Sequence, residues 1–217
     1  MNRGRKVISS NVILPNVVLL LAVFILAATA QTAPENRAAF AAKLVAAAVE
    51  RASHTVQYDG SYQKISYPNG DVAANRGACS DEIVRIYRAV GIDLQKEVHE
   101  DMVANFAAYP QKAKWHTSRT DTNIDHRRVE NLNIFFKRHG ETLPKSLDAA
   151  DYQPGDIVSW DLNGNNLTHI GMVVDQKGLF SRRYKVLHNI GAGPKIEDVL
   201  FDWKIIEHFR YFGPEKK

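Results

Sequence analysis

The hydrophobic pattern changes its period part-way along this 217-residue chain, and that change limits the folds available to it. Apolar residues first recur at helical spacing, and from Asp156 onward they alternate with a period of two. The first part predicts helices over 32–52, 80–90, 93–109 and 129–139. The second part predicts strands over 156–162, 169–175, 184–190 and 206–212. Helices followed by a run of strands indicate an α+β domain with an antiparallel sheet.

The first 30 residues are typical of an export signal rather than of the folded domain. A basic start, residues 2–6, precedes the apolar run 17–28, and Ala28-Thr29-Ala30 is a small-residue cleavage pattern. Twelve apolar residues are fewer than the roughly 20 of a spanning helix, so we expect no stable membrane span after cleavage. An uncleaved anchor is left open. We therefore expect a periplasmic or secreted protein with a single mature domain, residues 31–217.

Composition excludes some partners for this domain. The net charge is +4, and part of it lies in the signal, so the mature chain is only mildly basic. The sequence contains no Lys/Arg-rich run with interleaved aromatic residues, so we expect no nucleic-acid partner. Nothing in the composition or the motifs calls for a cofactor or a metal. The oligomeric state has no sequence signal.

Cys79 is the only cysteine, and an exported chain with one thiol cannot form an internal disulfide. Its sulfur lies at the predicted start of the 80–90 helix, where the helix dipole favours the thiolate. Asp81, two residues further on, works against that effect through its negative charge. The sequence therefore predicts a nucleophilic cysteine, and the alternative is a buried cysteine that acts as a small hydrophobic residue.

A cysteine nucleophile needs a base, and the base needs a group that orients it. His169 opens a predicted strand, and Gly171 leaves room beside it for a ligand or another backbone. If strands 169–175 and 184–190 form a hairpin centred near residue 179, His188 lies directly opposite His169. Asn189 is the second choice for the orienting group. The alternative is an ordinary pair of histidines on a half-buried sheet.

The stretch 120–128 is dense in polar side chains. Arg127 and Arg128 are candidates for binding a substrate carboxylate, because guanidinium binds carboxylate in a bidentate manner. Asp125 is a candidate for holding a substrate amine. The alternative is a solvated loop in which Asp125 pairs with Arg128.

The strand motifs resemble those of NlpC-type and CHAP cell-wall hydrolases, which belong to the papain-like cysteine peptidase superfamily. The similar segments are Pro154-Gly155-Asp156 with the following strand, and Thr168-His169-Ile170-Gly171 with its strand. The resemblance spans about residues 77–190. It implies a papain-like domain in which a cysteine at a helix start packs on the sheet. It also implies that Cys79, His169 and His188 form the catalytic set. Asn189, next to His188, is a further candidate for substrate binding.

A bacterial family known only as domain of unknown function 1287 resembles the chain more closely, over nearly the whole mature sequence. Segments 67–71, 123–128 and 188–194 carry that resemblance. Two features depart from the NlpC pattern. Ala78 stands where those enzymes usually have aspartate, and the long separation of Cys79 from His169 implies a helical insert at about 93–150.

The leading hypothesis is an exported amidase or peptidase that cleaves an amide bond, with peptidoglycan as the substrate class that the resemblance and the signal imply. The sequence does not separate a hydrolase from a transacylase. One alternative is a catalytically silent binding or scaffold module of the envelope. Another is a metal enzyme that uses His169, His188 and a carboxylate such as Asp156 or Asp175.

Overall fold

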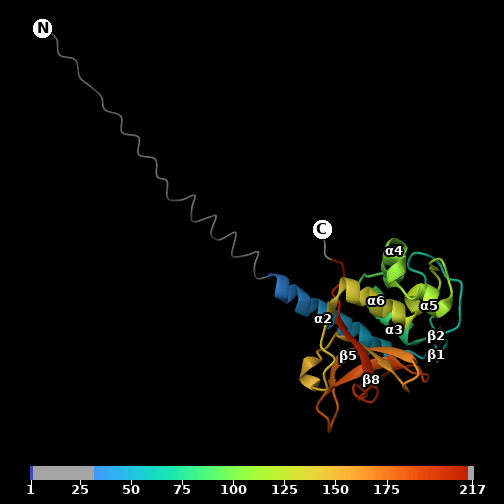
Figure 1. The fold of residues 1–217 in the computed structure, drawn as a ribbon. Helices are drawn as coiled ribbons and strands as arrows, with labels where there is room; N and C mark the ends of the chain where they lie inside the picture. Colours follow the sequence, from blue (N-terminus) through green and yellow to red (C-terminus); the bar gives the residue numbers. More distant parts are fainter. Residues whose placement is uncertain (2–31, 215–217) are drawn as a thin grey trace. The chain divides into compact units, whose positions relative to one another are not determined.

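The computed structural model describes residue 1 and residues 32–214 (Figure 1). The predicted export signal thus falls on residues that, apart from Met1, lie outside the described part. The chain divides into two compact units, Met1–Ala38 and Ala39–Lys217, and the fold described below is that of the second. Among the described residues, no helix has the length and apolar character needed to cross a membrane.

The helices agree with the sequence pattern except that the predicted helix 93–109 is interrupted and that the short helix α5 was not predicted. The α-helices are α2 (Thr32–Arg51), α3 (Cys79–Ala89), α4 (Leu94–Ala104), α5 (Gln111–Trp115) and α6 (Val129–His139). Short 3₁₀ turns follow at η1 (Phe106–Ala108), η2 (Asp125–Arg127) and η3 (Ala149–Asp151). The predicted helix 93–109 is interrupted at Asn105, whose side-chain amide donates to the carbonyl of Asp101 at 3.2 Å. Asparagine competes with the helical backbone in this way, and the chain therefore restarts as η1.

The second half of the chain forms an antiparallel six-stranded sheet, so the α+β class is confirmed. Its order is β3-β8-β4-β5-β6-β7. The strands are β3 (Glu141–Thr142), β4 (Ile157–Asp161), β5 (Thr168–Lys177), β6 (Tyr184–Asn189), β7 (Pro194–Glu197) and β8 (Lys204–Arg210). The pattern predicted β4, β5, β6 and β8, and the structure adds the two edge strands. A separate parallel pair joins β1 (Gln57–Tyr58) to β2 (Arg76–Gly77).

Each face of the sheet has its own hydrophobic cluster. Helices α3 and α6 pack on one face, where Ile170 and Met172 of β5 belong to the main core (Figure 1). Leu132 and Phe136 of α6 are fully buried there, so the stretch expected as an insert contributes to the core itself. On the other face, Trp160 is fully buried in a smaller cluster. Alternation along the strands therefore sends neighbouring side chains into different environments.

Asp156 joins the start of β4 to strand β8 through a buried charge. Its carboxylate accepts from Arg210 Nε at 2.7 Å and Nη2 at 3.0 Å, and from His208 Nε2 at 3.0 Å. The backbone N–H of Gln153 donates to the same carboxylate at 2.8 Å. Asp156 and His208 are both fully buried, so the carboxylate holds the strand start through bonds that no water can replace.

We predict that Asp156→Asn lowers the free energy of unfolding by about 3 kcal/mol, because the half-buried guanidinium of Arg210 and the buried imidazole of His208 lose an anionic acceptor. Urea unfolding of the mature domain measures the effect. Asp175→Asn is the matched control, since Asp175 is exposed on β5. Equal stability of the two variants would contradict the assignment of Asp156 as a structural charge.

Candidate active site

Cys79 is the first residue of α3 and is only 4% exposed. Its pKa rises to about 11 because burial penalises the thiolate. Hydrogen bonding from the backbone N–H groups of Ile170 and Ser80 and from the Tyr58 hydroxyl opposes that rise, while the charge of Asp81 adds to it. The helix dipole was expected to favour the thiolate, but burial outweighs it, and Cys79 is a neutral thiol at neutral pH.

A buried ion pair fixes the start of α3. Asp81 accepts from Arg127 Nε at 2.7 Å and Nη2 at 3.0 Å, and also from the backbone N–H of Ala78 at 2.6 Å. Arg127 further donates to the carbonyl oxygens of Ser61 and Asp59, at 2.8 and 3.1 Å. All three guanidinium nitrogens of Arg127 are therefore engaged within the protein, and the residue proposed to bind a carboxylate of the substrate already binds one of the chain's own.

His169 and His188 form a buried pair. Nε2 of His169 lies 2.9 Å from Nδ1 of His188, and the rings are 2% and 1% exposed. The rings of Trp160 and Trp203 lie beside them, with the Trp203 ring within 5.9 Å of both imidazoles, centroid to centroid. Burial, and then the neighbouring His188, lowers the pKa of His169 to about 3. His169 is therefore neutral at physiological pH, and burial lowers the pKa of His188 as well.

The register of the hairpin differs from the expected one by two residues. Gly171, not His169, lies opposite His188. A Cβ at position 171 would lie 2.6 Å from Val186 Cγ1 and 3.2 Å from His188 Cβ. The glycine therefore provides the space that lets the His188 ring lean across β5 to His169, rather than space for a ligand.

The Cys79 sulfur contacts β5 at Ile170, the residue that follows His169. Cys79 belongs to the helix-facing cluster, whereas His169 stands beside Trp160 on the opposite face. The hydrogen-bonded ladder between β5 and β6 begins at Gly171 and His188. The backbone N–H of Ile170, one residue before Gly171, is hydrogen-bonded to the sulfur of Cys79 instead. The sulfur therefore lies where β5 and β6 part, next to the residue that follows His169.

Asn189 occupies a different position from the one a base-orienting group needs. Its side-chain amide donates to the carbonyl of Gly77 at 3.3 Å and its oxygen accepts from the N–H of Gly191 at 3.2 Å. It ties the end of β6 to the segment that precedes Cys79. Of the two candidates, His188 is the one that contacts His169.

Asp125 and Arg128 also have partners within the chain. Asp125 is 1% exposed and accepts from Gln111 Nε2 at 2.7 Å and from the backbone N–H of Asp121. Arg128 stacks on Trp115 at 4.1 Å, and its Nη1 lies 3.6 Å from Asp125. These contacts agree with the alternative in which Asp125 pairs with Arg128, but residues 125–127 are buried rather than solvated. Part of the Arg128 side chain remains accessible.

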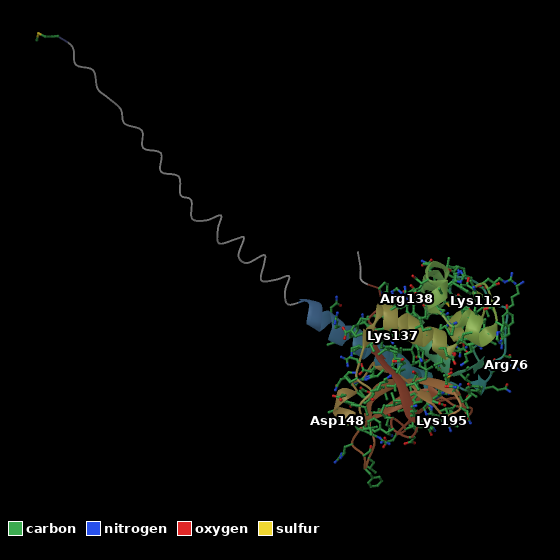
Figure 2. The ribbon with its side chains drawn as sticks, in the orientation of Figure 1. Arg76, Lys112, Lys137, Arg138, Asp148 and Lys195 are labelled. Carbon is green, nitrogen blue, oxygen red and sulfur yellow. The ribbon has the colours of Figure 1, made fainter. Side chains whose placement is uncertain are left out.

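Two residues of this region are not among the predicted catalytic and substrate-binding residues. The Tyr58 hydroxyl is hydrogen-bonded to the sulfur of Cys79, and burial raises the pKa of Tyr58 above its usual range. Glu197 lies on β7, the edge strand where Lys195 is labelled in Figure 2. Its carboxylate lies 3.0 Å from Nε2 of His188. Both residues sit on strands of four residues or fewer, which carry too little alternation to be recognised in a sequence.

The metal alternative has no support in this part of the chain. Within residues 32–214, no group of three His, Cys, Asp or Glu side chains is arranged to hold a metal ion. Asp156 is engaged by Arg210 and His208, and Asp175 is exposed.

Comparison with known proteins identifies the family. Residues 45–211 match the model described as Domain of unknown function (DUF1287). The chain belongs to the DUF1287 family. It is 54% identical over 160 residues to the uncharacterized protein YijF of Escherichia coli (strain K12). The aligned segment covers 73% of this chain and 75% of YijF. No solved structure matches the chain. Every residue discussed as part of the site lies within the segment that matches DUF1287.

We predict that Gly171→Ala lowers the free energy of unfolding by about 1–3 kcal/mol, because the added methyl group overpacks a buried contact. Chemical denaturation measures this change. Gly60→Ala is the control, since its added Cβ would meet only Ala78 Cβ, at 4.0 Å. A Gly171→Ala protein as stable as the control would show that His188 does not need this space.

We predict that Cys79 of the folded protein reacts with iodoacetamide with an apparent pKa above the usual value near 8.5. The raised pKa favours the folded state below the pKa of the unfolded chain, and this stability is lost as the pH rises toward about 11. Labelling rates between pH 7 and 11 test the prediction, with urea-unfolded protein as the reference. A folded-state value below that of the unfolded chain would contradict it.

Proposed function

We propose that this DUF1287 protein is an exported cysteine hydrolase, an amidase or peptidase with a papain-like domain. The observation that carries the proposal is the position of Cys79. Its sulfur faces the β5 backbone at Ile170, directly after His169, whose ring is oriented by His188. In nucleophilic catalysis by cysteine a base takes the thiol proton, and a buried thiol packed against the strand that carries His169 supports that role for His169.

In the proposed reaction, the Cys79 sulfur attacks an amide carbonyl carbon while His169 takes the thiol proton. Since the pKa of Cys79 is raised and that of His169 is lowered, the proton moves as the S–C bond forms rather than beforehand. The oxygen of the tetrahedral intermediate takes the negative charge. The backbone N–H of Cys79, at the start of α3, is suited to bind that oxygen.

The second half of the reaction returns the enzyme to its starting state. The C–N bond breaks, and His169 gives its proton to the leaving amine, which leaves a thioester on Cys79. Water, deprotonated by His169, then attacks the thioester and releases the carboxylic acid and the free thiol. An amine in place of water would give a transacylase.

The substrate class rests on the sequence. The predicted signal and the resemblance to cell-wall hydrolases support an amide bond of peptidoglycan, and they support a periplasmic or secreted location. Arg128 is the member of the 125–128 cluster with an accessible side chain, so it is the candidate to bind a carboxylate of the stem peptide.

We predict that the mature protein releases fragments from purified peptidoglycan and that Cys79→Ser lowers the rate at least about 10³-fold. Chromatography with mass spectrometry identifies the new ends. Serine preserves the shape of the side chain, so the variant should unfold at the same denaturant concentration. Asp175→Asn is the control and should retain full activity.

Inhibitors separate the alternatives in the same assay. Prolonged treatment with iodoacetamide should stop the reaction, and a chelator should leave it unchanged. Loss of activity with the chelator alone would favour a metal enzyme. Unchanged turnover in Cys79→Ser, or binding of peptidoglycan without cleavage by the folded protein, would contradict the proposal and favour a silent binding module.

A further inference from the structure

The hydrogen bond between His169 and His188 has no direction of its own. Each neutral imidazole carries one N–H, so either ring can donate to the other across the 2.9 Å between Nε2 of His169 and Nδ1 of His188. The two directions have opposite consequences. If His169 donates through Nε2, its Nδ1 has a free lone pair. If His188 donates, Nδ1 of His169 carries a proton and cannot accept another.

Glu197 distinguishes the two directions. Its carboxylate oxygen Oε2 lies 3.0 Å from Nε2 of His188. An ionised carboxylate can only accept a hydrogen bond, so Nε2 of His188 must carry the proton. Nδ1 of His188 is then the acceptor, Nε2 of His169 is the donor, and Nδ1 of His169 is the unprotonated nitrogen.

We infer that Glu197 is a positioning residue that sets the tautomers of both His188 and His169, and thereby makes Nδ1 of His169 the basic nitrogen. Glu197 acts through His188 and has no recorded contact with Cys79. The inference rests on the proposed function, in which His169 is the base that takes the thiol proton.

The surroundings of the pair allow Glu197 to do this without charging it. Burial lowers the pKa of both imidazoles, and the charge of Glu197 opposes this effect at His188. A protonated His188 would be a donor at both nitrogens and would force His169 into the wrong tautomer. The Glu197 carboxylate lies at the outer end of the pair, where 44% of its side chain is exposed. Water there screens its charge, so the carboxylate accepts a hydrogen bond from His188 without promoting protonation of the ring.

The position of Glu197 makes it suitable for substitution. It lies on the edge strand β7, opposite Val186 of β6, and its side chain is half-buried. Asp202 also acts on His188 through its charge, yet its recorded ionic partner is Arg183, at 3.6 Å. Asp202→Asn therefore removes a similar charge without removing the acceptor, which makes it the matched control.

The test is the tautomer of each ring in the full mature protein, measured by ¹⁵N–¹H spectra that distinguish protonated from unprotonated ring nitrogens. In the unmodified protein and in Asp202→Asn, both His188 and His169 should carry the proton on Nε2. Glu197→Gln should keep this pattern, because its amide oxygen still accepts. Glu197→Lys, which can only donate, should reverse both tautomers, and Glu197→Leu should leave a mixture.

The rate of peptidoglycan cleavage is the second measurement. Glu197→Lys and Glu197→Leu should lower the rate about 10- to 100-fold relative to Glu197→Gln, as is typical for a residue that orients a catalytic group from one step away. Each variant should unfold at the same denaturant concentration as the unmodified protein. Tautomers that do not respond to Glu197, or that respond without any change in rate, would overturn the inference.

The two readings separate this inference from the proposed function. If the tautomers follow Glu197 as described but no amide substrate is cleaved by any form of the protein, Glu197 still orients the pair and the hydrolase proposal falls. If turnover depends on Cys79 while the tautomers ignore Glu197, the hydrolase stands and the role of Glu197 is refuted.

Discussion

The ion pair between Asp81 and Arg127 is the contact on which the geometry around Cys79 depends. Asp81 holds the N–H of Ala78 and so fixes the residue before the cysteine, while Arg127 binds the carbonyl oxygens of Asp59 and Ser61. One buried pair thereby joins the start of α3, the loop after Tyr58 and the turn η2. It also changes the electrostatics of the thiol, because a carboxylate that would repel the thiolate is matched by a guanidinium at 2.7 Å. Removal of either partner would leave a buried charge, which is costly, so the pair also makes this arrangement specific.

Much of the architecture could be predicted because it follows from periodicity. The start of α3 and the strands β4, β5, β6 and β8 came from apolar spacing alone, and pairing His169 with His188 required only a hairpin. The register was wrong by two residues because the hairpin turns further along the chain than residue 179. Lys177 pairs with Tyr184, and the irregularity between Val173 and Lys177 brings the later pairs only part of the way back toward the expected register. Neither the position of the turn nor a local irregularity of this kind leaves a mark in the hydrophobic pattern. The polar cluster at 125–128 was identified as important, but the sequence could not show that Asp81, 46 positions away from Arg127, is its partner.

The remaining site residues were hidden for a different reason. Tyr58 and Glu197 belong to strands of two and four residues. Strands so short have no period, and an isolated tyrosine or glutamate in a polar segment resembles any surface residue. What distinguishes them is the group each one contacts, and such contacts arise only when β1 and β7 are placed against the central elements. Sequence patterns identify the elements that form the core, whereas the groups that adjust a site from its edge depend on tertiary placement.

Under the proposed chemistry, a buried thiol must still be reached by its substrate, and the contacts of the sulfur indicate the direction. The N–H groups of Ile170 and Ser80 belong to the backbone of β5 and α3, which the core holds in place. The third contact, Tyr58, is made by a side chain, and 43% of the surface of Tyr58 is exposed. A carbonyl carbon can approach the sulfur only where a group is able to move aside, and that is the side occupied by Tyr58. The raised pKa of Cys79 then belongs to the covered state. Displacement of Tyr58 by a substrate would bring the carbonyl to the thiol, whose proton His169 is proposed to take.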